Sequence, residues 1–142
     1  MSDHGAAVKA FTLFCDDVRQ EQGGKLSAMG IYQGVMAIPA DEVLLPKLVA
    51  WLMLVQPYSE MADKARVQLW DGEQLLSDAE ITFANPPWDA QGAAVPNMGQ
   101  TTVNIPFEMV PFKARAGMAL RLVYTADNYN YESDALHIIK AV

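Results

Sequence analysis

The stretch FCDDVRQEQGGK, from Phe14 to Lys25, decides how this sequence folds. It gathers a lone cysteine, two adjacent aspartates and a glycine pair, a combination that fits either a reactive cluster or a β-hairpin. Residues 22–24 (Gln-Gly-Gly) suit a three-residue hairpin loop, because glycine takes the left-handed conformation that such loops require. We therefore predict that Val8–Arg19 and Lys25–Ile38 are paired strands, with a two-residue loop, Gly23-Gly24, as the alternative.

The three-residue loop sets the register of this hairpin. It places Glu21 opposite Lys25, which predicts a cross-strand ion pair that contributes ~0.2–1 kcal/mol. It also places Phe14 opposite Tyr32 as an aromatic pair on one face. The charged residues of the stretch are therefore expected to be structural.

The two aspartates are predicted to lie on opposite faces of the hairpin, because successive residues of a strand point to opposite sides. Asp16 shares the face of Gly30, whereas Asp17 lies beside Cys15 and Arg19. The pair cannot chelate one ion together unless a bulge breaks the strand. In a sandwich one of the two carboxylates points towards the core, where it needs hydrogen-bond donors. We predict that this aspartate pins a neighbouring loop through backbone N–H groups, with Arg19 as another donor, so that its replacement by Asn lowers the melting temperature.

Outside the hairpin, apolar residues alternate with polar ones, which is the period of a half-buried β-strand. The alternation is clear over residues 66–83, where Asp71-Gly72 is a strong hairpin-turn signal. It returns over residues 102–109 and 118–125. Pro106 falls on the polar side of its segment, which suits an edge strand.

Two segments are apolar at nearly every position and are expected to be buried on both faces. They are Lys47–Gln56, which is predicted to be a central strand, and Val8–Cys15. Helix candidates are limited to the short pieces Asp41–Leu45 and Ser59–Lys64. The segment 85–100 is rich in Pro, Gly and Asn and is expected to be a long loop.

These patterns predict an all-β protein of about seven to nine strands. The expected fold is a single antiparallel β-sandwich of immunoglobulin-like or C2-like type, with a closed barrel as the alternative. Parallel pairs are not expected, because the chain lacks segments long enough for crossover helices. Residues 1–142 are expected to form one domain, of which residues 1–7 are flexible.

The composition is that of a globular protein, with 51% apolar residues and a net charge of −7. The acidic balance argues against nucleic acid and anionic membranes as partners, because both require a basic footprint. The longest apolar run, Leu48–Val55, is far shorter than the ~20 residues of a membrane helix. Cys15 is the only cysteine, which fits a reducing compartment, and the N-terminus lacks the basic region of a signal peptide. A cytoplasmic protein is therefore expected.

The opening motif F-C-D-D-x-R-x-E-x-G-G-K, followed by L-S-A-M-G-I-Y-Q-G, resembles that of an uncharacterised family of small bacterial proteins. The later segment Gly117-x-x-x-Arg121-Leu122-Val123-Tyr124 is similar to the closing strands of the same family. The resemblance implies a bacterial, single-domain β-protein. It supplies no activity, ligand or catalytic residue.

No catalytic or cofactor-binding residue is predicted. Cys15 shares an apolar phase with Leu13 and is flanked by carboxylates, which raise the pKa of a thiol and make it a poor nucleophile. His137 is expected to be an ordinary strand histidine. An enzyme would require His137 within hydrogen-bond reach of Cys15 or Asp17 in an open cleft.

The acidic turn at residues 126–134 is the only candidate for a cation site. Asp127, Glu132 and Asp134 cluster there, and acidic loops at a sandwich end can bind calcium. However, the spacing forms no regular D-x-D-x-D-G ladder, and such turns are common for conformational reasons. We therefore predict no metal ligand and keep calcium as an alternative.

Aromatic residues in loops are the better candidates for a contact surface. Trp88, Tyr129 and Tyr131, together with Asp127, are proposed to contact a ligand or partner, because loop Tyr and Trp supply rigid contact area. In the competing interpretation Trp88 covers the end of the core and the tyrosines pack on an edge strand. The sequence therefore favours a non-enzymatic binding or assembly module that meets a protein partner, or a second copy in a homodimer, through loops or an edge strand. The alternatives are a small-ligand or calcium-binding sandwich and, third, an enzyme.

Overall fold

The computed structural model describes residues 8–57, 62–83, 100–127 and 129–141, and all regular structure in these ranges is β-strand. No helix among them is long and apolar enough to cross a membrane. In chain order the strands are β1 (Lys9–Gln20), β2 (Leu26–Tyr32), β3 (Val35–Ile38), β4 (Glu42–Leu45), β5 (Leu48–Pro57), β6 (Lys64–Asp71), β7 (Gln74–Thr82), β8 (Gln100–Met109), β9 (Phe112–Arg115), β10 (Ala119–Ala126), β11 (Asn130–Glu132) and β12 (Leu136–Lys140).

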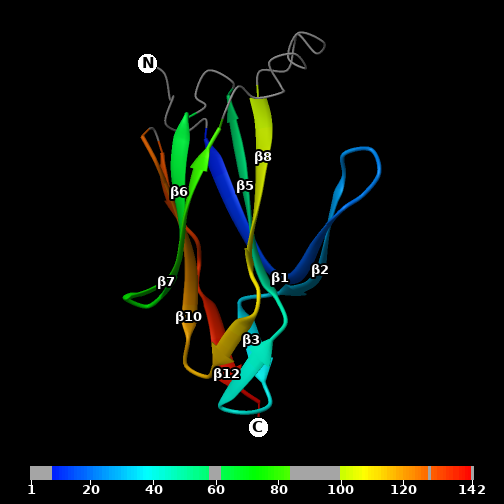
Figure 1. The fold of residues 1–142 in the computed structure, drawn as a ribbon, viewed down its shortest axis with the longest axis vertical. Helices are drawn as coiled ribbons and strands as arrows, with labels where there is room; N and C mark the ends of the chain where they lie inside the picture. The colour runs from blue at the N-terminus through cyan, green and yellow to red at the C-terminus, as the bar shows by residue number, and fades with distance from the viewer. Residues whose placement is uncertain (1–7, 58–61, 84–99, 128, 142) are drawn as a thin grey trace.

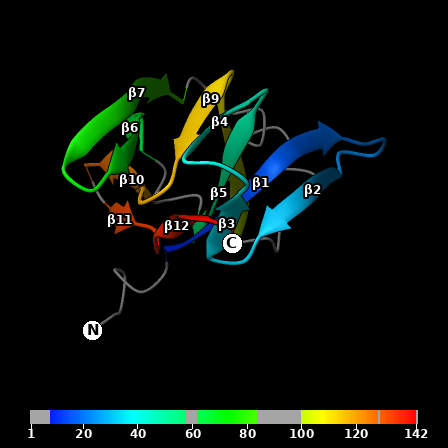
Figure 2. The same ribbon diagram turned by 90° about the horizontal axis from the view of Figure 1, so that it is seen from below.

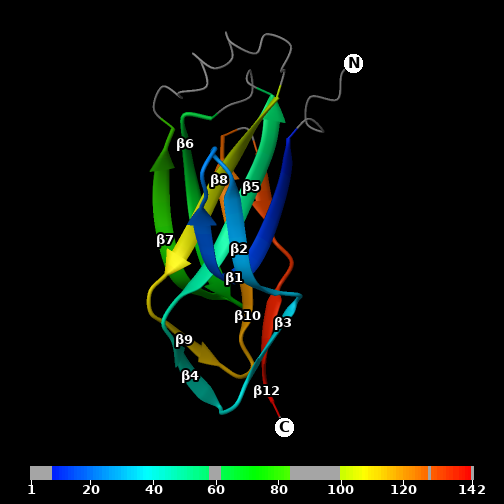
Figure 3. The same cartoon turned by 90° about the vertical axis from the view of Figure 1, so that its right-hand side faces the viewer.

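The strands form two large sheets and one small one. The four-stranded sheet has the order β2-β1-β5-β8, and the six-stranded sheet has the order β3-β12-β10-β6-β7 with β11 added on β10. β4 and β9 form a separate pair at the end of the molecule near the C-terminus (Figures 1 and 3). The predicted all-β class is confirmed, whereas seven to nine strands was too low a number because it missed the short strands. The sandwich, with the closed barrel as its alternative, stays a prediction.

One hydrophobic core has members in both large sheets. Figure 2 shows the strands of the two sheets in an end-on view. β5 is the central strand that was predicted, since it is buried along most of its length between β1 and β8. β8 is an edge strand, as Pro106 indicated. The fully buried leucines of the core come from both sheets: Leu48, Leu52, Leu54, Leu69, Leu120, Leu122 and Leu136.

The hairpin register is the predicted one. Phe14 lies opposite Tyr32 and Gln20 opposite Leu26, and the Glu21 N–H donates to the carbonyl of Lys25 across 2.7 Å, which confirms the three-residue loop. The predicted ion pair between Glu21 and Lys25 is wrong, because it is not among the ion pairs of the described residues. The Glu21 carboxylate instead accepts a hydrogen bond from the hydroxyl of Ser27 at 2.8 Å.

The second strand of the hairpin is shorter than predicted. Lys25–Ile38 is not one strand, because β2 ends at Tyr32 and the chain continues as β3 in the other sheet. Gly34 stands in this break with a φ of +86°, a left-handed conformation that glycine adopts without strain. β3 then pairs in parallel with β12, with Met36 opposite Ile138. The expectation of antiparallel pairs alone is therefore wrong, and no helix is needed because most of the chain connects these two strands.

The predicted helix at Asp41–Leu45 is also wrong. Glu42–Leu45 forms β4, which pairs with β9. Most of the other helix candidate, Ser59–Lys64, lies outside the described residues, and Lys64 begins β6. The Asp71-Gly72 hairpin is confirmed, since Asp71 lies opposite Gln74 where β6 meets β7.

The distal part of the β1–β2 hairpin stands away from the body of the molecule (Figures 1 and 2). We call residues 16–30 the arm. Apolar residues of the arm pack on the outer face of the four-stranded sheet and form a second, smaller core there. The buried members of this second core are Cys15, Val49 and Trp51, and the partly buried ones are Leu13, Val18, Leu26, Ala28 and Met53.

Candidate functional site

β1 changes its neighbours along its length. Residues Lys9–Cys15 pair with β5, whereas pairing with β2 begins only at Phe14 and continues to Gln20. In the described part of the chain, residues 9–13 of β1 therefore have a strand on one side only. This interval is also less buried than predicted, since Phe11 is 52% exposed. The expectation that Val8–Cys15 is buried on both faces is thus wrong, because the face of β1 that points away from the main core is exposed at Phe11.

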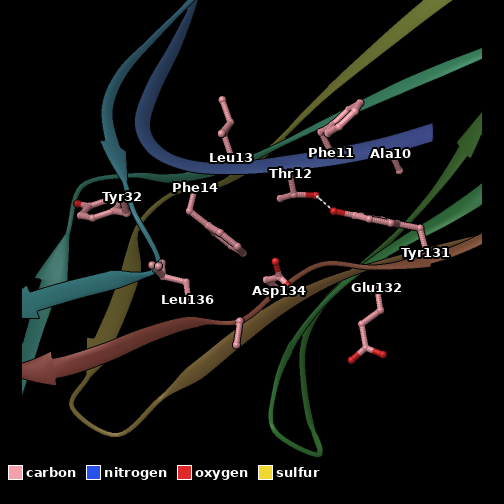
Figure 4. Close-up of a pocket in the computed structure, with 12 residues that line it drawn as sticks. Ala10, Phe11, Thr12, Leu13, Phe14, Tyr32, Tyr131, Glu132, Asp134 and Leu136 are labelled. Atoms are coloured by element: carbon pink, nitrogen blue, oxygen red, sulfur yellow. Dashed lines mark hydrogen bonds between the residues drawn. The ribbon is translucent and has the colours of Figure 1, made fainter.

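A cavity of about 470 Å³ lies against this open edge (Figure 4). Five consecutive residues of β1 line it, and neighbouring side chains of a strand point to opposite faces. The cavity must therefore lie beside the edge of β1 rather than over one face of its sheet. The opposite wall comes from the β11–β12 segment. We call this cavity the edge cleft, lined by Ala10, Phe11, Thr12, Leu13, Phe14, Tyr32, Gly34, Tyr131, Glu132, Asp134, Ala135 and Leu136.

The side chains of β1 present two different surfaces to the edge cleft. Thr12 and Phe14 point towards the β11–β12 segment, whereas Phe11 and Leu13 lie on the other side of the strand (Figure 4). Phe14 and Leu136 are buried and give the inner end of the cleft an apolar floor. An extended segment placed in the cleft would therefore meet apolar groups on both of its faces.

Tyr131 bridges the two walls of the edge cleft. Its hydroxyl donates a hydrogen bond to Oγ1 of Thr12 at 3.0 Å (Figure 4). Burial raises the pKa of Tyr131, the Thr12 hydrogen bond lowers it, and the nearby Asp134 carboxylate raises it further. A sequence-predicted contact residue thus lies in the cleft, where its ring and hydroxyl join the two sheets.

The edge cleft is acidic. Glu132 points away from β1 and forms an ion pair with Arg121 at 3.6 Å, whereas Asp134 lies in the gap between the two walls (Figure 4). Among the ion pairs of the described residues, Asp134 has no cationic partner, and its only hydrogen bond in that set is the one its backbone carbonyl accepts from Ser133. The described residues that line the cleft include no lysine or arginine. The Asp134 carboxylate is therefore available to a cation that a ligand brings.

The other predicted contact residues do not join this site. Tyr129 packs on Tyr124, with ring centroids 6.5 Å apart and an interplanar angle of 47°, and so supports the core. Asp127 is exposed in the turn after β10, and Trp88 lies outside the described residues. Among the residues that the structure places, no group of three or more His, Cys, Asp or Glu side chains could hold a metal ion.

The two aspartates of the hairpin lie on opposite faces, but neither is buried. Asp16 is exposed and accepts a hydrogen bond from the hydroxyl of Tyr32 at 2.5 Å. Burial, and then this hydrogen bond, raise the pKa of Tyr32 to about 12. The prediction of an inward aspartate that binds backbone N–H groups is therefore wrong, because the arm leaves the body at these residues.

Asp17 nevertheless ties the arm to the body. Its carboxylate accepts from Nζ of Lys47 at 3.0 Å and from Nε of Arg19 at 3.3 Å. These two hydrogen bonds, that of Lys47 first, lower the pKa of Asp17. Lys47 precedes β5 and also lies 3.7 Å from Glu108 of β8. Asp17 thus holds a loop, as predicted for one of the aspartates, but it does so through side chains at the surface.

Cys15 and His137 do not form a reactive pair in this structure. Cys15 is fully buried in the second core, and burial is the main cause that raises the pKa of its thiol. His137 is exposed on β12, in the other sheet, and no hydrogen bond among the described residues joins the two side chains.

No protein-family model matches the chain, and no curated protein matches it. The resemblance to an uncharacterised bacterial family stays a prediction. What the fold and the site define is an all-β protein with an acidic cleft at an incompletely paired strand edge.

The sequence predicted Tyr131 as a contact residue and placed Asp134 in an acidic turn, and both residues line the cleft. It did not predict that β1 forms the other wall. The available signal was Gln33-Gly34, which separates Tyr32 from Val35 in the strand predicted for Lys25–Ile38. A break at Gly34 leaves the hairpin partner of β1 too short to cover residues 9–13.

Proposed function

We propose that this chain is a non-enzymatic protein-binding module that holds its partner in the edge cleft. The observation that carries the proposal is the one-sided pairing of β1 over residues 9–13 within the described chain. A strand edge without a neighbour offers backbone donors and acceptors to another chain, and peptide-binding domains use such edges for β-strand addition.

The surroundings of this edge support recognition. A cavity of about 470 Å³ is within the ~300–1,000 Å³ range of ordinary binding sites. Phe11 is 52% exposed and supplies an aromatic anchor of the kind that dominates protein interfaces. The buried free thiol of Cys15 suits a reducing compartment, so we propose a cytoplasmic location in a bacterium.

Affinity capture with matched surface variants tests this function. The full chain is immobilised, exposed to a bacterial lysate, and its bound proteins are identified by mass spectrometry. Phe11→Asp places a charge at the edge cleft, and Leu44→Asp makes the same change at a side chain that is 64% exposed on β4, outside the cleft. We expect a protein that the wild type and Leu44→Asp capture and that Phe11→Asp loses.

Two results would contradict the proposal. If both variants captured the protein equally well, the contact surface would lie outside the cleft. A homodimer that forms through another surface, seen by light scattering as a dimer that survives Phe11→Asp, would also contradict the proposal. A dimer that Phe11→Asp dissociates would instead identify a second copy as the protein partner of this edge.

A further inference from the structure

We propose that the edge cleft takes one extended peptide segment, which adds a strand to β1 and directs a basic side chain to Asp134. The inference rests on the proposed function and deepens it, because it names the conformation and the charge of the segment that is bound.

The lining of the cleft indicates an extended ligand. Residues 10–14 of β1 and residues 131, 132 and 134–136 contribute nearly continuous stretches of chain to opposite walls. β11 pairs with β10, and no described strand pairs with its other edge. The cleft therefore separates an open edge of one sheet from an open edge of the other. A single extended strand can pair with the open edge of β1 along its length, which a compact ligand cannot.

The apolar residues of the cleft lie on both sides of β1. This arrangement favours a ligand whose successive side chains point to opposite sides. Phe14 and Leu136 form the buried floor, and Phe11 and Leu13 lie beyond the other face of β1 (Figure 4). Side chains of an added strand would point alternately to these two surfaces, because strands have a period of two residues. The ligand should therefore carry apolar side chains in both directions along a short extended stretch.

The charge of the cleft specifies a basic side chain. Asp134 lies in the gap without a cationic partner among the described residues, and its carboxylate contributes to the raised pKa of Tyr131. Glu132 adds a second negative charge on the same wall, although Arg121 balances it. A Lys or Arg of the ligand would pair with the Asp134 carboxylate, which is exposed, so the ion pair makes a modest contribution that depends on salt.

The same charge argument favours a foreign basic peptide over a second copy of this chain. Each copy carries a net charge of −7, so two copies repel one another at long range. A cationic segment is instead attracted to the acidic molecule, which increases its association rate.

The experiment selects ligands from a phage-displayed library of random peptides of about ten residues, which span roughly 33 Å when extended. The full chain is the target, and the dominant selected peptide is then synthesised with a fluorophore. Its affinity is measured by fluorescence anisotropy for the wild type, for Asp134→Asn and for Asp63→Asn. Asp63 is a matched control, because it is exposed and lies outside the cleft.

We expect the selected peptides to share one Lys or Arg within an alternating apolar pattern. Asp134→Asn should bind the peptide about fivefold more weakly than the wild type, since partly exposed ion pairs are modest. Asp63→Asn should bind as the wild type does. Exchange of the peptide Lys for Gln should cause the same loss in the wild type and no further loss in Asp134→Asn.

The inference is overturned if no peptide is selected, if the selected peptides lack a common basic residue, or if the two changes are additive. Failure of the proposed function is a separate result. If lysate capture depends on Phe11 but no peptide responds to Asp134→Asn, the protein-binding function is supported and the basic extended ligand is contradicted. If capture is indifferent to Phe11→Asp, the cleft itself is not the contact surface.

Discussion

Gly34 and Gly30 determine the path of the chain beside β1. Gly34 has a φ of +86° and lies where the chain crosses from the four-stranded to the six-stranded sheet. Its carbonyl accepts a hydrogen bond from the N–H of His137 at 3.0 Å, which fixes the crossing. Gly30 has a φ of +66° and faces the Asp16 carboxylate at the base of the arm. Gly34 thus ends the pairing of β2 beside the edge cleft, and Gly30 allows the chain to bend at the base of the arm.

Alanine at these two glycines should have different effects. Both changes place a side chain in a left-handed conformation, which costs about 1–2 kcal/mol. An added Cβ at Gly34 has open space, whereas at Gly30 it would overlap the carboxylate of Asp16. We expect urea denaturation to show a loss of unfolding free energy of about 1–2 kcal/mol for Gly34→Ala and about 1–2 kcal/mol more for Gly30→Ala.

Equal losses for the two variants would show that Asp16 moves aside freely. The matched check is Gly30→Ala combined with Asp16→Ala, which should recover the additional loss, since the overlapping group is then gone.

Tyr32 should make the fold sensitive to alkaline pH. The folded pKa is raised from 10.0 to about 12, mainly by burial and then by the hydrogen bond to Asp16. Because the neutral phenol is the form that the fold favours, its contribution is complete below pH 10 and is lost as the pH rises towards 12. Tyr124 acts in the same direction, since burial raises its pKa to about 12.

The measurement is chemical denaturation at a series of pH values. Wild-type stability should fall between about pH 10 and about pH 12, and Tyr32→Phe should fall less steeply. At neutral pH, Tyr32→Phe should be less stable by about 1 kcal/mol, because it loses one hydrogen bond. Parallel curves for the two proteins would contradict a neutral, hydrogen-bonded Tyr32.

The predictions for single residues succeeded where the two-residue period of a strand and the length of the hairpin loop determine which residues pair and which face each one shares. Phe14 opposite Tyr32, and Asp16 and Asp17 on opposite faces, follow from the three-residue loop and the period of a strand. The burial of an aspartate could not be predicted in this way. It depends on whether the sheet continues over that residue, and Asp16 lies where the arm departs.

At the scale of elements, the arm behaves as a cover over the second core. Cys15 is fully buried and Trp51 is 8% exposed beneath the base of the arm. Asp17 and Lys47 join the arm to the segment that leads into β5, at 3.0 Å. Val18, Leu26 and Ala28 of the arm also pack on this second core. The second core is much smaller than the main one, and weakly buried elements open more readily than the main core of a protein.

The thiol of Cys15 should report this opening. We expect slow labelling of native Cys15 by a disulfide reagent at about pH 8, because burial excludes the reagent and disfavours the thiolate. Asp17→Asn should label faster, since it removes the tie to Lys47. The ion pair is intact at this pH: the pKa of Asp17 is lowered from 3.8, so its contribution is lost only as the pH falls through that lowered value.

Asp63→Asn is the control for this labelling, because it removes the same charge at an exposed position outside the arm. Equal labelling rates for the wild type and both variants would show that the arm does not open as a unit. Complete labelling of the native wild type within the mixing time would contradict the burial of Cys15.

Element-scale prediction from sequence was good for strongly patterned strands and poor for short ones. β5 and β10 were evident because their apolar pattern extends over whole strands. β4 was predicted as a helix, since a piece of a few residues has no decisive period. The parallel pairing of β3 with β12 depends on segments about 100 residues apart in sequence, which local patterns do not encode.

At the scale of the whole molecule, one core stabilises both large sheets, so the body should unfold as one unit. Leu52 in the four-stranded sheet and Leu122 in the six-stranded sheet are both fully buried members of this core. Replacement of either by Ala should reduce the free energy of unfolding by about 2–5 kcal/mol. Tryptophan fluorescence and circular dichroism should give coincident urea transitions. Separate transitions, with each variant affecting only one, would divide the chain into two cooperative units.

The edge cleft is a feature of the whole molecule, and its existence could not be predicted from the sequence. Its walls, residues 10–14 and 131–136, are about 120 residues apart and meet only when the two sheets close on their common core. Tyr131 was predicted as a contact residue from its type and its loop. Phe11 and Thr12 could not be, because their position beside an open strand edge depends on where β2 ends.

The most direct test of the open edge is amide hydrogen exchange of residues 9–13, measured by NMR in the free protein and with the selected peptide. In the free protein, alternate amides of this segment should be protected by β5 and the remaining ones should exchange rapidly, because a strand directs successive N–H groups to opposite sides. The rapid amides should become protected when the peptide binds. Uniform slow exchange of all five amides in the free protein would show that the edge is already occupied, and would contradict the central claim.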